Sequence, residues 1–202
     1  MSIAKIAAAC SSGLDLAVPG AYIRPVPDDW IRQWGDPALR EIAAPVRSFD
    51  DLLAARVGRM KRQLADAQGA GLAATQIGHM RRLFVFRAWP EDQIDVLVNP
   101  EVVSSSSERA IFIEGCLSYQ EITVEVERPL SVVVRAQRID GSSRLLEASG
   151  HEASLLQHEI DHLDGILTLD RASRPERRRA IRALLEARAP RLSSGPPELR
   201  AA

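Results

Sequence analysis

The segment QHEIDHLDG, residues 157–165, constrains this chain more than any other part of its sequence. It places two of the four histidines, His158 and His162, four residues apart, with Glu159 directly after the first. On an α-helix four residues turn the chain by about 400°, so the two imidazoles point from one face, roughly 40° apart. Glu159 points about 100° from His158 and can lie beside an ion without binding it. We therefore expect a helix over residues 151–164 that either holds a metal ion or is a charged surface helix.

The residues around the histidine pair favour the metal site. Apolar side chains fill the helix between and beside the histidines, which predicts partial burial: Leu155, Leu156, Ile160 and Leu163. A buried pair of histidines needs a ligand or hydrogen-bond partners, because an unpaired polar group inside a protein is costly.

A metal site on this helix needs a third protein ligand. The zinc proteases with a third histidine would place it where this chain has Thr168, so that class is excluded. Glu176 and Glu186 lie in a highly charged segment typical of a solvated surface. Cys116, in the segment EGCLS, remains as a candidate because a thiolate binds Zn²⁺ or Fe²⁺ well. The alternative for Cys116 is a small buried core residue.

Composition sets the protein class. The chain has 202 residues, of which 46% are hydrophobic, and this is enough to bury a substantial core. Its net charge of −1 gives no electrostatic case for binding DNA or an acidic membrane. Two cysteines, Cys10 and Cys116, allow one disulfide at most, and no apolar run reaches the roughly 20 residues that span a bilayer. We expect a cytoplasmic protein.

The chain divides into three parts. Residues 1–35 contain several prolines and no sustained periodicity, and we expect an N-terminal arm in which Trp30 and Trp34 dock onto the body. Residues 36–189 form the predicted catalytic domain. Residues 190–202 have a composition typical of a disordered tail.

Hydrophobic periodicity predicts an α+β fold for the domain. Strands are expected over 83–88, 94–100, 122–127 and 130–137, and the Asp140–Gly141 turn predicts a hairpin with the segment RLLEAS that follows. Helices are expected at 36–45, from a Ser48 cap to Gly69 and Gly71, at 151–164, and from Ser173 to Pro190 with Glu176 completing a capping box. We expect mainly antiparallel sheets packed around the central metal-binding helix, with a C-terminal helix.

Three segments together resemble the signature motifs of the peptide deformylases. They are GAGLAATQ (69–76), EGCLS (114–118) and QHEIDHLDG (157–165), in the family's order. The intervals are also similar, with 116 − 76 = 40 residues from Gln76 to Cys116 and 158 − 116 = 42 from Cys116 to His158. The similarity covers roughly residues 35–188.

The resemblance implies an enzyme that removes the formyl group from the N-terminal formylmethionine of new polypeptides. It implies one Fe²⁺, which Zn²⁺ or Ni²⁺ can replace, with Cys116, His158 and His162 as ligands. Glu159 is then the general acid/base, and Gln76 and the backbone N–H of Leu117 form the oxyanion site. Gly71 offers its backbone to the substrate peptide, and Gly115 lets the chain come close beside Cys116.

The sequence departs from the family at the expected pocket for the methionine side chain. Tyr119 and Gln120 replace an apolar residue and a proline, and Thr123 stands where many members carry an arginine. His151 and Ser154, one residue before Leu155, stand where aliphatic side chains are common. The change is either drift within a tolerant pocket or an altered substrate preference.

Three functions are compatible with these residues. The first is a metal-dependent deformylase acting on N-formylated peptides. The second is a related amidase with another substrate preference, and the third is a non-catalytic metal-binding or ribosome-associated protein. The basic segment RPERRRAIRALLEAR predicts a transient ribosome contact, and a solvated helix is its alternative.

Overall fold

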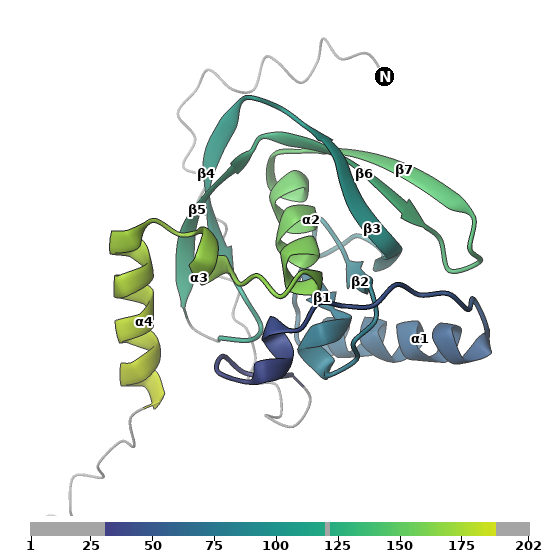
Figure 1. Ribbon diagram of the computed structural model, residues 1–202, viewed down its shortest axis with the longest axis horizontal. Helices are drawn as coiled ribbons and strands as arrows, with labels where there is room; N and C mark the ends of the chain where they lie inside the picture. The colour runs from purple at the N-terminus through teal and green to yellow at the C-terminus, as the bar shows by residue number, and fades with distance from the viewer. Residues whose placement is uncertain (1–30, 120–121, 189–202) are drawn as a thin grey trace, which may run out of the picture.

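The two β-sheets of this protein lie around one buried helix, in a computed structural model that describes residues 31–119 and 122–188 (Figure 1). A five-stranded antiparallel sheet has the order β1-β2-β3-β6-β7, and β4 and β5 pair antiparallel in a second sheet. The strands are β1 (Gly71–Ala73), β2 (Leu83–Phe86), β3 (Asp95–Ser105), β4 (Arg109–Gly115), β5 (Thr123–Pro129), β6 (Ser131–Gln137) and β7 (Ser143–Ser149). The expected α+β class with antiparallel sheets is confirmed.

The helices differ in how deeply they are buried. They are η3 (Pro37–Arg40) and η4 (Ala74–Ile77), both 3-10 helices, and α1 (Asp51–Asp66), α2 (Gly150–Leu163), α3 (Thr168–Arg171) and α4 (Arg174–Arg188). Ten of the fourteen residues of α2 are buried, so this helix is enclosed rather than solvated. Figure 1 shows α2 between the β4–β5 hairpin and the larger sheet, with α4 outside the hairpin.

Apolar side chains hold α2 in place. Leu156 and Leu163 pack in one cluster with Phe84 and Leu97 of the larger sheet. A second cluster joins the hairpin to α4 through Val124 and other buried residues. Because both clusters border α2 or the loop after β4, the core fixes the positions of the segments that carry the motifs.

The ends of α1 differ from the sequence expectation. Asp50, not Ser48, is the N-cap, and its carboxylate accepts a hydrogen bond from the N–H of Leu53. The helix ends before Gly69, because Gln68 adopts the left-handed conformation with φ 53° and the Gly69 N–H bonds to the C=O of Leu64. This is a common helix ending in which a polar residue takes the place usually filled by glycine.

Two strands were missed by the periodicity. β1 has only three residues, which is too short to show a period. β4 is apolar on both faces, since Ile111 and Ile113 are exposed while Phe112 on the opposite face is half-buried. The expected hairpin at Asp140–Gly141 is confirmed by the pairing of β6 with β7, and β3 extends five residues beyond the expected end at residue 100.

The remaining helix expectations hold in part. The segment 36–45 forms only the short η3, and α3 was not expected. Ser173 caps α4 by accepting from the Glu176 N–H, as expected. The Glu176 carboxylate does not close the capping box with Ser173; it accepts from the N–H of Glu125 and from Arg179.

Residues 31–35 of the expected arm lie against the domain. Ile31 is fully buried, and the N–H of Arg32 bonds to the C=O of Gln76. Trp34 docks as expected: its side chain packs against the cluster beneath α4, and its backbone N–H donates to the C=O of Ser118. Trp30, Cys10 and the segments 1–30 and 189–202 lie outside the described residues. Among the described residues, every helix is too short or too polar to cross a bilayer.

Candidate metal centre

The three side chains expected to bind metal converge in the interior. Cys116, directly after β4, and His158 and His162 on α2 are all buried, and their ligand atoms lie within 4.8 Å of one another. The Sγ atom of Cys116 is 3.2 Å from Nε2 of His162. The Ser118 N–H points at the same sulfur, 3.4 Å away.

Glu114 orients His158. Its Oε2 accepts a hydrogen bond of 3.0 Å from Nδ1 of His158, which leaves Nε2 of that ring for a metal ion. Burial would raise the pKa of the Glu114 carboxyl, but hydrogen bonds from His158 and Arg128 outweigh it and lower the pKa to about 2. Glu114 is therefore ionised and accepts from His158.

The Glu114 carboxylate belongs to a buried network of charges. Arg128 on β5 donates two hydrogen bonds to it, of 2.5 and 2.9 Å, and a third of 2.9 Å to Asp161 on α2. Asp161 in turn accepts two bonds from Arg171 on α3. Ser154 adds its hydroxyl to Glu114 at 2.8 Å. Because each buried charge faces an opposite one, the network can be stable inside the protein and can hold α2 in register with the β4–β5 hairpin.

Glu159 is buried beside the ligand set. Its Oε2 has no hydrogen-bond partner among the described residues, and burial raises its pKa to about 7 in the metal-free protein. A Cβ added to Gly71 would lie 2.1 Å from Oε1 of Glu159. The Glu159 side chain thus occupies the space that the missing side chain of Gly71 leaves open, which explains why glycine is needed at this end of β1.

Gln76 lies on the sulfur side of the centre. Its Oε1 accepts from the Ala73 N–H at 2.8 Å, which fixes the orientation of the amide. Its Nε2 then lies 3.1 Å from Oγ of Ser118 and 3.6 Å from Sγ of Cys116. The peptide group between Leu117 and Ser118 is held as well, because the C=O of Leu117 accepts a hydrogen bond from the side chain of Gln33.

The residues expected to form the substrate pocket do not all have exposed side chains. Tyr119 is 2% exposed and packs in the cluster beneath α4, and Leu155 is buried against the larger sheet. Ser154 is buried and donates its hydroxyl to Glu114, so it offers no spare donor to a substrate. Thr123 is exposed at the start of β5.

His151 and Gly115 are the remaining expected pocket residues. His151 is exposed in the first turn of α2. The centroid of its ring lies 5.6 Å from that of Trp89, a residue of the loop between β2 and β3. It is seven residues before His158, close to two helical turns, so the two imidazoles share one face of the helix. A Cβ added to Gly115 would meet no atom of the described residues within 4 Å, so this glycine borders open space beside Cys116 as far as those residues show.

Sequence reasoning missed four residues of this centre: Glu114, Ser118, Arg128 and Asp161. Glu114 and Ser118 flank Cys116 in EGCLS, and Asp161 lies between the two histidines. Because these side chains are polar, a solvent-facing position was equally plausible from the sequence. On β5 the exposed positions, which include Glu125 and Glu127, alternate with buried ones, and Arg128 occupies a buried position. That inward position was the only sequence signal for its role.

The donor set fits a single divalent metal ion. One thiolate and two imidazoles are the ligands that Zn²⁺ and Fe²⁺ accept, and three protein ligands leave a coordination position for substrate or water. Oε2 of Glu159 is buried beside the ligand atoms without a hydrogen-bond partner among the described residues, which is typical of a site built for a group that protein atoms do not supply.

Known proteins are similar to this chain in sequence and in fold. The family model for polypeptide deformylase matches residues 28–178. The peptide deformylase of Rhizobium meliloti (strain 1021) is 41% identical over 155 residues, which are 75% of this chain and 89% of that protein. That of Thermotoga neapolitana is also 41% identical over 155 residues, or 77% of this chain and 93% of that protein.

Solved structures agree with the sequence matches. The crystal structure of a peptide deformylase from Legionella pneumophila superposes with a TM-score of 0.73 and is 40% identical, covering 79% of this chain and 98% of that one. The peptide deformylase from Plasmodium falciparum gives a TM-score of 0.74 at 32% identity, covering 77% and 93%. With a family match over most of its length and relatives of this similarity, the chain belongs to the peptide deformylase family.

Proposed function

We propose that this protein is a metal-dependent hydrolase that removes the formyl group from N-formylmethionyl peptides. The observation that carries the proposal is the convergence of Cys116, His158 and His162 beside a buried carboxylate, Glu159. Membership of the deformylase family supports the same reaction.

Cys116, His158 and His162 would hold one divalent ion. We expect Fe²⁺, as the resemblance to the peptide deformylases implies, and a mixed sulfur and nitrogen site can also accept Zn²⁺ or Ni²⁺. When bound, the ion supplies a Lewis acid that polarises the formyl C=O and lowers the pKa of water. The thiolate of Cys116 neutralises one of the two charges of the ion.

Glu159 would act as the general acid/base. Its carboxylate is buried next to the ligand atoms, and this burial raises its pKa to about 7. A carboxylate in this environment can take a proton from water as the water attacks the formyl carbon. The same group can then pass that proton to the leaving amine of the peptide, which releases formate.

Gln76 and the backbone N–H of Leu117 would stabilise the negative charge that develops on the formyl oxygen. The amide of Gln76 is fixed by Ala73 and points its nitrogen towards the sulfur. Donors that are oriented before the reaction contribute most, and the loss of one typically costs about 10²–10³ in rate.

The substrate peptide would lie along β1, with the backbone of Gly71 as a partner. β1 is the edge of the five-stranded sheet, so within residues 31–119 and 122–188 one side of its backbone has no paired strand. An extended peptide can add to such an edge through main-chain hydrogen bonds. The pocket for the first side chain would involve Gly115, Thr123 and His151, which are exposed, while Tyr119, Ser154 and Leu155 would support it from behind.

A second candidate function is the removal of formyl groups from peptides with a polar first residue. His151 is the observation that favours it, because an exposed imidazole in the first turn of α2 is more polar than the aliphatic side chain common there. Turnover of formyl-Met-Ala-Ser would be compared with that of formyl-Ser-Ala-Ser and formyl-Gln-Ala-Ser. A higher kcat/KM for the polar peptides selects this function over the first.

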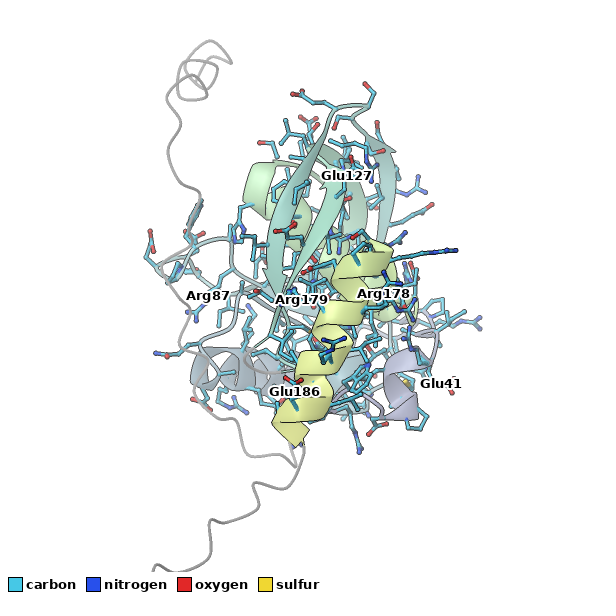
Figure 2. All side chains as sticks on the ribbon, turned by 90° about the vertical axis from the view of Figure 1, so that its left-hand side faces the viewer. Glu41, Arg87, Glu127, Arg178, Arg179 and Glu186 are labelled. Carbon is cyan, nitrogen blue, oxygen red and sulfur yellow. The ribbon has the colours of Figure 1, made fainter. Side chains whose placement is uncertain are left out.

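A ribosome contact is proposed for α4. Arg174, Arg178 and Arg182 lie four residues apart and so form one stripe, and none of them has a carboxylate partner among the described residues. Figure 2 shows Arg178 and Arg179 on this helix, outside the β4–β5 hairpin. Arg178→Glu with Arg182→Glu should reduce co-sedimentation with ribosomes; unchanged co-sedimentation would leave α4 as an ordinary solvated helix.

The main proposal is tested on protein purified without oxygen, with metal content and turnover of formyl-Met-Ala-Ser measured on one sample. Glu159→Gln should keep the metal and lose at least about 10² in kcat, since the amide has the same shape and cannot take a proton. Cys116→Ala should lose both metal and activity. A Glu159→Gln protein with wild-type kcat would contradict the proposed role, and wild-type protein with bound metal and no turnover of any formylated peptide would favour the non-catalytic alternative.

A further inference from the structure

A second cavity lies away from the metal centre, and its rim is strongly basic. It has a volume of about 570 Å³ and lies where the segment before α1, the first turns of α1 and the loop before β2 meet. Three arginines line it, Arg47, Arg56 and Arg81, together with His79. None of the residues proposed for the deformylase reaction lines this cavity.

The arginines around this cavity lack carboxylate partners. Among the described residues, no ion pair involves Arg47, Arg56 or Arg81, although the structure pairs many other arginines with acids. The only carboxylate in the lining is that of Asp50, and it already accepts from the N–H of Leu53 as the cap of α1. With His79 neutral, the lining carries 3 − 1 = +2 charges.

His79 is neutral because of its position. Nη1 of Arg56 lies 3.1 Å from Nε2 of His79, and a guanidinium can only donate, so this nitrogen is an acceptor. Burial, and then the charges of Arg56 and Arg81, lower the pKa of His79. The histidine therefore orients Arg56 without adding a charge, and within the described part of the chain no acceptor occupies the other nitrogens of that guanidinium.

The basic rim is held in place by the backbone. The side-chain amide of Asn99 makes two hydrogen bonds to the backbone of Val46. It accepts from the Val46 N–H at 2.8 Å and donates to the Val46 C=O at 2.9 Å, which fixes the segment that carries Arg47. Ala44 accepts from the N–H of Arg82 and donates to the C=O of Met80. Residues 44–47 and 79–82 are therefore joined before any ligand arrives.

We propose that this cavity binds the phosphate group of a small phosphorylated molecule of about nucleotide size. Arginine forks match phosphate oxygens in pairs, and three of them around one hollow suit one phosphate group. The volume lies within the range of small-molecule sites, and the exposed side chain of Leu52 gives the attached organic part an apolar wall. The three arginines line a single cavity and the whole chain has a net charge of −1, which favours a small ligand over a long RNA strand.

The test measures binding of three probes to the full chain by calorimetry at low salt: inorganic phosphate, AMP, and a short single-stranded RNA. AMP should bind, and phosphate should compete with it. Arg56→Gln and Arg81→Gln should each weaken AMP binding by about tenfold or more, because each removes a charged donor. Arg56→Lys, which keeps the charge and loses the fork, should fall between wild type and Arg56→Gln.

Arg59→Gln is the matched control, since Arg59 is exposed on the same helix, has no ion pair among the described residues and does not line the cavity. It should leave AMP binding unchanged. All these variants should keep the deformylase activity of the wild type, so a failure of the proposed reaction would not affect the result. The proposal is overturned if AMP and phosphate do not bind at about 10 mM, if Arg59→Gln weakens binding as much as Arg56→Gln, or if only the RNA binds.

Discussion

Oε2 of Glu114 lies 3.0 Å from Nδ1 of His158, and this contact determines which nitrogen of His158 faces Cys116 and His162. The carboxylate is itself held by Arg128 and Ser154. The orientation of a candidate metal ligand on α2 therefore depends on charged residues of the β4–β5 hairpin, which is a separate sheet.

Glu114→Gln should weaken metal binding by about 10–100-fold, because loss of a partner behind a ligand disturbs its orientation and basicity. It should also lower the free energy of unfolding by about 3–5 kcal/mol, since Arg128 loses one of two buried carboxylates. Competition with a chelator and urea denaturation measure the two effects. Ser154→Ala is the control, because it removes only one hydrogen bond to Glu114 and should cost about 1 kcal/mol. Wild-type metal affinity in Glu114→Gln would contradict the orienting role.

Gly71→Ala should lower kcat by at least about 10² while the protein remains folded and metal-loaded. The added Cβ would meet Oε1 and Cδ of Glu159 at 2.1 and 2.5 Å, so the carboxylate must move from its position. Steady-state kinetics and metal analysis on the same preparation test this. Gly58→Ala, inside α1 where the nearest atom is the flexible end of Arg62 at 3.7 Å, should leave kcat unchanged and raise stability by about 1 kcal/mol. Equal kcat values for the two variants would show that catalysis does not depend on the observed position of the Glu159 carboxylate.

Cys116→Ala and His162→Ala should each reduce bound metal from one ion per chain to a small fraction, because both residues supply ligand atoms to the same cluster. Metal analysis after dialysis against a weak chelator checks this. Chelation should also lower the unfolding temperature of the wild type and leave that of Cys116→Ala unchanged, since a metal that binds only the folded state stabilises it. A Cys116→Ala protein that retains a full ion would show that the sulfur is not a ligand.

Asp170 should make stability depend on pH below neutrality. Burial alone would raise its pKa, but hydrogen bonds from Arg40 and the Leu167 N–H, with the charge of Arg177, lower it. A carboxyl whose pKa is lowered in the folded state stabilises the protein above its unfolded pKa of about 3.9, and this contribution is lost as the pH falls through the lower folded value. The difference in unfolding free energy between wild type and Asp170→Asn should therefore be full at pH 6 to 7, as measured by urea denaturation, and shrink below about pH 4.

Glu147→Gln is the control for this pH dependence, because Glu147 is exposed on β7 and has no ion pair among the described residues. Its unfolding free energy should differ from the wild type by less than about 0.5 kcal/mol throughout. A difference for Asp170→Asn that does not change with pH would assign its effect to the cap on Leu167 alone.

The sequence predicted the helix of the metal centre well because its signal is local. His158 and His162 are one turn apart, and a helix alone brings them to one face. The same holds for the Asp140–Gly141 hairpin and the Ser173 cap. The periodicity failed for β1 and β4, because a three-residue strand has no period and β4 is apolar on both faces. The sequence could not show that Ser154 donates its hydroxyl to Glu114, because the two residues are 40 positions apart along the chain.

By itself, the sequence determined which chemical groups are available and how each is presented on its own segment: a thiol after a strand, two imidazoles on one helical face and a carboxylate between them. Only the tertiary structure decided that Cys116 meets the histidines, that Gly71 makes room for Glu159, and that three arginines from two segments line one cavity. These are contacts between segments distant in sequence, and they depend on how the sheets and helices pack around the core. No local pattern of residues encodes such a contact, because many weak packing interactions together determine where the segments lie.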